Sequence, residues 1–186
     1  LLSQLGRHEE ALAEITRALE IDPLSLVLNW IYGSSLFLAR RYDDAVEQLT
    51  KVAESDPDFA LAHYSLASVY MVQGEYNKCV AELVRYLEIR GDLDVANPIR
   101  ESYSEQGWHG FLLATVEKGA SFDSPWHNPS IFLAALGEKD NAFLELTKAY
   151  ENRDSYTMLL KVDPRLDPLR TDLRFAELVE KIGFPD

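Results

Sequence analysis

Few residues in this sequence have a type and spacing that would support chemistry. The four histidines, His8, His63, His109 and His127, are scattered, and none stands at the spacing that zinc ligands adopt. The single cysteine, Cys79, excludes an internal disulfide and a multi-cysteine metal site. The sequence contains neither a glycine-rich phosphate loop nor a nucleophile turn. We therefore predict no catalytic residue, no metal ligand and no cofactor, and we do not expect an enzyme.

The composition limits the partners of this chain. Its 18 basic and 31 acidic residues give a net charge of −13, which repels nucleic acid and anionic membranes. No apolar run is long enough to span a bilayer. The lone cysteine fits a reducing compartment, so we expect a cytoplasmic location. Because the chain opens without an initiator methionine, we expect a fragment, and its targeting cannot be judged.

The segments that would position any functional residue recur with a fixed period of 34 residues. The segments 6–23, 40–57 and 74–91 align in this frame, and each has a small residue, then a large apolar residue, then a turn. The small column holds Ala11, Ala45 and Cys79. The segments between them have helical apolar spacing, and in each of them a small residue (Gly33 or Ala67) would allow close approach. Each unit is therefore predicted to be a helix pair that stacks on the next pair.

This pattern resembles the tetratricopeptide repeat, whose period of about 34 residues is the same. The resemblance implies an all-α, right-handed solenoid of antiparallel helix pairs forming one continuous domain over 1–186. We expect regular repeats over 1–91, a degenerate repeat and loop over 92–124, a regular repeat over 125–154 and a capping segment over 155–186. The degenerate part is predicted to be two helices broken near Gly107, and Trp126 is predicted to begin the regular repeat that follows.

The carboxy-terminal part, about 125–186, resembles the ends of bacterial multidomain signalling and transcription regulators. This resemblance implies a regulatory or partner-binding portion whose effector domain lies upstream in the same chain. The whole chain is thus predicted to be a non-enzymatic scaffold for protein–protein interaction.

A second set of residues, which we call the stripe, lies beside the packing columns on the first helix of two successive repeats. In tetratricopeptide solenoids, the first helices line the concave surface, so the resemblance implies that the stripe faces it. Its members recur in register from one repeat to the next: Trp30, Ser34, Phe37, Tyr64, Ser68 and Met71. One interpretation is a groove that binds a protein or peptide through apolar and aromatic anchors. The other is packing between neighbouring helices. A small-molecule sensor with its ligand in the apolar groove is the alternative function. The Lys, Asn and Arg clamp of chaperone-binding relatives is absent from these positions.

The stretch DPRLDPLRTDLRF (163–175) could serve either as the structural end of the repeat array or as a phosphate site. Asp163 and Asp167 suit helix N-caps and the prolines after them suit first helical positions, so one or two single turns are expected. A final helix would then dock on 140–152 as a cap through its apolar stripe, Phe175, Leu178, Val179 and Ile182. Its arginines, Arg165, Arg170 and Arg174, would lie over helix carbonyls and the acidic surface, or would form a phosphate site.

Overall fold

Every regular element of the part of the chain that the structure describes is a helix. The computed structural model describes residues 1–118 and 128–184. The chain divides into two compact units, Leu1–Ala96 and Asn97–Asp186. The predicted all-α helical repeat fold is confirmed. The single continuous superhelix over 1–186 stays a prediction, and we describe each unit by itself.

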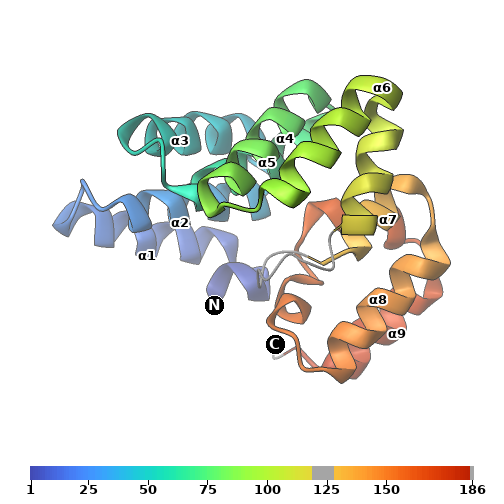
Figure 1. Ribbon diagram of the computed structural model, residues 1–186. Helices are drawn as coiled ribbons and strands as arrows, with labels where there is room; N and C mark the ends of the chain where they lie inside the picture. The colour runs from blue at the N-terminus through green and yellow to red at the C-terminus, as the bar shows by residue number, and fades with distance from the viewer. Residues whose placement is uncertain (119–127, 185–186) are drawn as a thin grey trace. The chain divides into compact units, whose positions relative to one another are not determined.

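The first unit is a stack of antiparallel helices (Figure 1). Its elements are η1 (Leu2–Leu5), α1 (His8–Ile21), α2 (Leu26–Leu38), α3 (Tyr42–Ser55), α4 (Ala60–Gln73) and α5 (Tyr76–Arg90). Each α-helix packs on the next, and α2 also contacts α4. Because α1, α3 and α5 begin at His8, Tyr42 and Tyr76, the predicted period is present in the helix boundaries.

The packing columns lie in the core of this stack. Ala11, Ala45 and Cys79 are all buried. Leu49 is fully buried against α2, where a Cβ atom placed on Gly33 would lie only 2.7 Å from its Cγ atom. Such a distance is shorter than van der Waals contact allows, so glycine at this position sets how closely α2 and α3 approach.

The second unit begins within a long, broken helix. The helix α6 (Leu93–Lys118) crosses the boundary between the units and is interrupted at Gly107, whose φ of 66° and ψ of −154° suit glycine alone. The predicted break is therefore confirmed. The elements α7 (Ser130–Leu136), α8 (Lys139–Glu151), η3 (Ser155–Leu159), η4 (Pro164–Leu169) and α9 (Leu173–Ile182) follow. Trp126 and most of the predicted loop lie outside the described residues.

The segment 163–175 is part of the architecture. Asp163 caps η4 by accepting a hydrogen bond from the backbone N–H of Arg165, and Asp172 caps α9 in the same way through Arg174. The helix α9 packs on α8, as predicted (Figure 1). Only part of its expected apolar stripe is buried, because Val179 and Ile182 remain half-exposed while Phe175 and Leu178 are covered.

A buried ionic cluster joins η3 to η4. The carboxylate of Asp163 is fully buried and accepts hydrogen bonds from Nη2 of Arg165 at 2.7 Å and from the hydroxyl of Tyr156 at 3.0 Å. Arg165, which was expected over helix carbonyls and the acidic surface, directs its guanidinium to the buried carboxylate of Asp163. Arg170 does donate to carbonyl oxygens, those of Lys161 and Asp163, which lie in the turn before η4.

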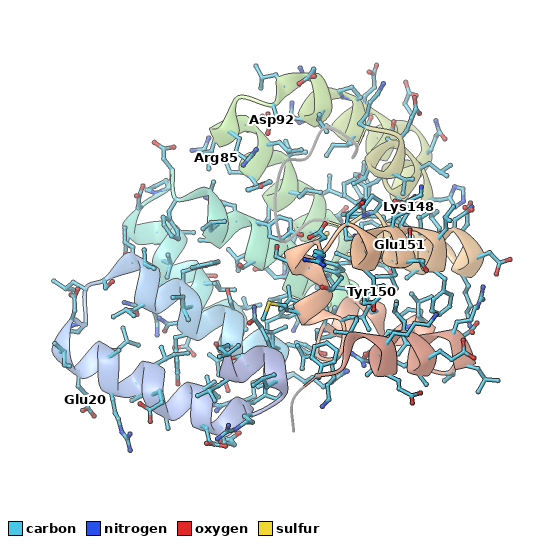
Figure 2. The ribbon with its side chains drawn as sticks, turned by 90° about the horizontal axis from the view of Figure 1, so that it is seen from below. Glu20, Arg85, Asp92, Lys148, Tyr150 and Glu151 are labelled. Atoms are coloured by element: carbon cyan, nitrogen blue, oxygen red, sulfur yellow. The ribbon has the colours of Figure 1, made fainter. Side chains whose placement is uncertain are left out.

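Charged side chains cover the outer faces of both units. Glu20 on α1, and Lys148 and Glu151 on α8, are exposed examples that Figure 2 labels. No helix in the described ranges combines the length and the apolar character that a membrane span requires.

The contact between Gly33 and Leu49 predicts a coupled mutational effect. Alanine favours a helix over glycine by about 1 kcal/mol, but in the native chain the added methyl group collides with Leu49. We expect Gly33→Ala to bring no stabilisation, or to destabilise, in the native chain. In a Leu49→Ala background, which removes the obstacle, it should raise the free energy of unfolding by about 1 kcal/mol. Urea unfolding of all four chains measures this, and an equal gain in both backgrounds would contradict it.

The buried cluster predicts that two similar Asp-Pro pairs differ in their effect on stability. Asp163→Ala leaves Arg165 buried without its carboxylate, which should cost about 3–5 kcal/mol. Asp167 pairs with Arg170 at 2.6 Å, but both side chains are more than a quarter exposed. Asp167→Ala should therefore cost less than about 1 kcal/mol. Thermal and urea unfolding compare the two variants, and similar losses would show that burial of the Asp163 pair is not decisive.

Candidate functional site

The helices α2 and α4 carry the predicted groove stripe. Ser25 fixes the start of α2 because its hydroxyl accepts a hydrogen bond from the N–H of Leu28. The two helices contact each other directly. The six residues of the stripe fall into two groups of different exposure.

Trp30 and Ser34 are half-buried and are held together by a residue outside the stripe. The indole Nε1 of Trp30 donates to Oγ of Ser65 at 2.9 Å, and Oγ of Ser34 lies 3.3 Å from the same oxygen. The Trp30 ring also meets Phe59 edge to face, with 6.3 Å between the ring centroids. These contacts fix the orientation of the indole. Ser65 was not anticipated from the sequence, although its place one residue after Tyr64 put it beside the stripe.

The other aromatic members of the stripe are core residues. Phe37 and Tyr64 are each 6% exposed, and the Tyr64 ring packs on that of Tyr86 with centroids 5.1 Å apart. Phe37 belongs to the apolar cluster formed around Leu36 and Leu49. Ser68 is buried, and its hydroxyl donates to the carbonyl of Tyr64 at 3.0 Å. Met71 is half-buried. The described contacts therefore bring together Trp30 and Ser34. The buried members, Phe37, Tyr64 and Ser68, have packing roles. A partner-binding role for the stripe stays a prediction.

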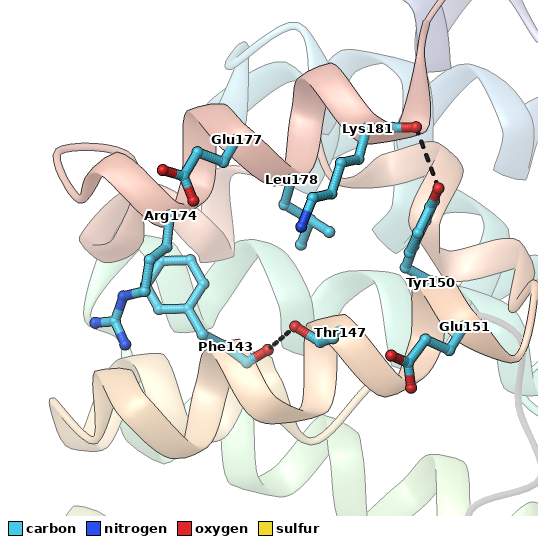
Figure 3. Close-up of a pocket in the computed structure, with 8 residues that line it drawn as sticks. All are labelled: Phe143, Thr147, Tyr150, Glu151, Arg174, Glu177, Leu178 and Lys181. Carbon is cyan, nitrogen blue, oxygen red and sulfur yellow. Dashed lines mark hydrogen bonds between the residues drawn. The ribbon is translucent and has the colours of Figure 1, made fainter.

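A pocket lies in the second unit, between α8 and α9. Figure 3 shows this shallow pocket of about 200 Å³, with the Lys181 side chain extending across it toward Leu178. The eight residues that line it are Phe143, Thr147, Tyr150, Glu151, Arg174, Glu177, Leu178 and Lys181. The hydroxyl of Tyr150 donates to the Lys181 carbonyl at 3.3 Å. The lining contains two acidic groups, Glu151 and Glu177, and two basic groups, Arg174 and Lys181. Its charge therefore favours neither an anionic nor a cationic ligand.

The three arginines of the carboxy-terminal stretch do not converge on one site. Arg165 pairs with the buried Asp163, and Arg170 pairs with Asp167. Arg174 pairs with Asp140 and Asp172 and lies 4.3 Å from the centroid of the Phe143 ring. Because each guanidinium already faces a carboxylate, the geometry favours architecture over the phosphate-site hypothesis. The hydrogen bonds from the side chain and backbone of Arg174 lower the pKa of Asp172 to about 2.

The pKa of His8, at the start of α1, is shifted from its ordinary value. His8 stands in the column that holds Tyr42 and Tyr76 in the next repeats. Burial, opposed by the charge of Glu9 and reinforced by that of Arg40, lowers the pKa of His8. Its buried Nδ1 atom has no hydrogen-bond partner among the described residues. These properties fit a packed neutral imidazole. Within residues 1–118 and 128–184, no group of three or more potential ligands is placed to hold a metal ion.

Comparison with known proteins supports the reading of the first unit. Two family models, both described as tetratricopeptide repeat, match residues 1–23 and 36–97. No curated protein and no solved structure matches the chain. The fold and its period define a helical repeat protein of the all-α class. The chain carries matches to tetratricopeptide repeats over residues 1–23 and 36–97, within the first unit and at the start of α6. Such repeats generally mediate protein–protein interaction, and their family is typically a non-enzymatic scaffold.

The partly buried imidazole of His8 predicts a specific acid sensitivity. Because its pKa is lower in the folded than in the unfolded chain, the unfolded chain binds more protons as the pH falls through about 6.5. Stability should therefore fall with acidification through this range. His8→Tyr, the residue type of the next two repeats, should remove this part of the loss. Melting temperatures of both chains from pH 8 to pH 5 test this, and parallel curves would contradict it.

Proposed function

We propose that this chain is the partner-binding part of a larger protein and that its first unit binds an apolar or aromatic protein segment on the surface of α2 and α4. The observation that carries the proposal is the half-buried Trp30, whose indole is held in one orientation by Ser65 and Phe59. An aromatic side chain that is already ordered loses little conformational freedom on binding, and such residues are frequent hot spots.

The three half-buried members of the stripe form the contact surface in this proposal, and the three buried members support it. Trp30 supplies the aromatic anchor, Ser34 a hydroxyl beside it, and Met71 an adaptable apolar side chain on α4. Phe37, Tyr64 and Ser68 hold the helices beneath. The proposed partner is a protein or peptide, and the proposed location is cytoplasmic. Membranes and nucleic acid are not proposed as partners, because the chain carries a net charge of −13.

The proposed biological setting is a bacterial signalling or transcription protein whose effector domain lies upstream of this region. This part of the proposal rests on the resemblance of residues 125–186 to the ends of such regulators. The capping arrangement of α8 and α9 is compatible with it, since a repeat array requires a covered terminal face. The coding sequence upstream of Leu1 tests it directly, because an effector domain should be encoded there.

The groove is tested by substituting its anchor. A displayed library of peptides with aromatic and apolar anchors is selected on the native chain, and the selected peptide is then titrated into variants. Trp30→Ala should weaken its binding by about 30-fold, the equivalent of about 2 kcal/mol. Ile21→Ala provides the matched control, because Ile21 is apolar and 88% exposed but lies outside the stripe.

Circular dichroism separates lost binding from lost folding. Met71→Gln keeps the side-chain volume while adding a polar group, and should also weaken binding without loss of helicity. If Trp30→Ala stays folded and binds the peptide as the native chain does, the contact surface lies elsewhere. If Ile21→Ala weakens binding equally, the selected peptide does not use the stripe.

A further inference from the structure

The two helices that carry the stripe contain no aspartate, glutamate, lysine or arginine. The helix α2 has no charged residue, and in α4 only His63 could carry a charge near neutral pH. The helices that alternate with them are rich in charge. Their charged residues are Glu9, Glu10, Glu14, Arg17 and Glu20 on α1, Asp43, Asp44, Glu47, Lys51 and Glu54 on α3, and Lys78, Glu82, Arg85, Glu88 and Arg90 on α5. From α1 to α5, helix charge is therefore confined to alternate members.

Burial alone does not account for the missing charge on α2. Val27 is 51% exposed, and Trp30, Ser34 and Leu38 are half-buried. Spacings of three and four residues place these four side chains on one side of the helix. A solvated helix face usually carries charged or polar residues, as α1 and α3 do. The side of α2 that carries Trp30 is therefore both accessible and uncharged.

The basic groups next to the stripe in the sequence make contacts with other helices. Arg41, in the turn after α2, pairs with Asp44 of α3 at 2.7 Å, and Nη1 of Arg40 donates to the hydroxyl of Tyr42 at 3.4 Å. On α4, His63 is 8% exposed, and its Nδ1 lies 2.6 Å from Oε2 of Glu82 on α5. The six residues of the stripe themselves offer no cation to a carboxylate and no anion to an ammonium group.

The serine hydroxyls beside Trp30 supply one more hydrogen-bond donor than their described contacts use. Oγ of Ser65 accepts from the indole of Trp30 at 2.9 Å and lies 3.3 Å from Oγ of Ser34. The contact between the two serines uses one of their two hydroxyl protons, whichever of them donates. Hydroxyls elsewhere, such as those of Thr16 and Ser68, donate to the carbonyl four residues earlier. Within the described residues Ser34 and Ser65 make no such bond, so one hydroxyl proton remains for an acceptor from outside.

We propose that the stripe recognises an uncharged segment of its protein partner, in which an apolar side chain contacts Trp30 and a backbone carbonyl accepts the remaining hydroxyl proton of Ser34 and Ser65. This inference rests on the proposed function and adds the chemistry of the partner to it.

The absence of charge distinguishes a carbonyl from a carboxylate as the acceptor. A carboxylate would lose hydration at the stripe without gaining a cation, in a unit whose acidic residues outnumber its basic ones. A partner ammonium group would likewise lose water without gaining an anion at the stripe. A backbone carbonyl accepts a hydrogen bond without carrying a charge, and a peptide segment offers one at every residue.

Parallel selections identify the segments that depend on the stripe. A displayed library of random peptides of about twelve residues is selected on the native chain and on Trp30→Ala. Peptides enriched by the native chain alone should be depleted in Asp, Glu, Lys and Arg relative to the library. Their dissociation constants should change by less than about threefold between about 50 mM and about 500 mM salt, because screening weakens interactions between charges.

A lysine introduced on the stripe tests whether the missing charge determines the partner. Ser34→Lys should weaken binding of the uncharged peptides by about tenfold and, in a new selection, should enrich peptides that contain Asp or Glu. Val27→Lys places the same charge at a 51% exposed position one turn earlier and should act in the same direction, even where Ser34→Lys fails to fold. Ile21→Lys is the matched control outside the stripe and should change neither result.

The carbonyl contact is tested by replacing single backbone amides of a selected peptide with esters, whose carbonyls accept hydrogen bonds less strongly. One position should lose affinity on the native chain, and this loss should disappear on the variant that combines Ser34→Ala with Ser65→Ala. If no position shows a loss that depends on the two serines, the carbonyl contact is wrong.

Two outcomes separate the failure of this inference from the failure of the proposed function. Peptides that require Trp30 but bind through Asp, Glu, Lys or Arg, with dissociation constants that rise about tenfold over the same salt range, would overturn the inference and leave the proposed function in place. Selected peptides that bind Trp30→Ala as tightly as the native chain would overturn the proposed site, and this inference with it.

Discussion

The close approach of α2 to α3 depends on one contact, that of the Leu49 side chain with the backbone at Gly33. No side-chain atom fits between them, since a Cβ atom would lie 2.7 Å from Cγ of Leu49. The equivalent residues of the next pair, Ala67 and Leu83, are likewise buried. A helix pair packed in this way still exposes an apolar face, which the following pair covers. The period of the repeat therefore reflects a packing requirement, and the other features of the first unit are placed by it.

The repeated part of this fold is predictable from sequence because the same packing requirement acts several times in succession. Ala11, Ala45 and Cys79 identify the buried face by recurrence alone, and Gly107 identifies the break in α6 by its backbone freedom. The cluster of Asp163, Arg165 and Tyr156 occurs once and lies within irregular turns. Neither periodicity nor capping rules indicate that this carboxylate is fully buried, so the partner of Arg165 was not predictable.

The candidate site shows a similar limit. The repeat register puts Trp30 and Tyr64 at equivalent positions along α2 and α4, but it does not specify how deeply each ring is covered. That depth depends on Ser65, Phe59 and Tyr86, which lie outside the stripe and meet it only after the helices pack. In recognition by such a surface, the half-buried residues would contact the partner, while the buried residues beneath them would be held in place by packing. A change of partner specificity would then alter the half-buried residues more readily than the buried ones.

Gln48 donates to Asn29 between α3 and α2, and Glu82 lies 2.6 Å from His63 at the equivalent positions of α5 and α4. These two polar pairs constrain the order in which one set of side chains can be exchanged for the other. Histidine with glutamine satisfies every hydrogen bond while uncharged, so it is a permissible intermediate between the Asn29–Gln48 and His63–Glu82 sets. Asparagine with glutamate is not equivalent, because the asparagine amide already donates to the carbonyl of Pro23 and its oxygen would face an acceptor-only carboxylate. A mutational path between the sets therefore passes more easily through the histidine than through the glutamate, and the acidic residue arrives last.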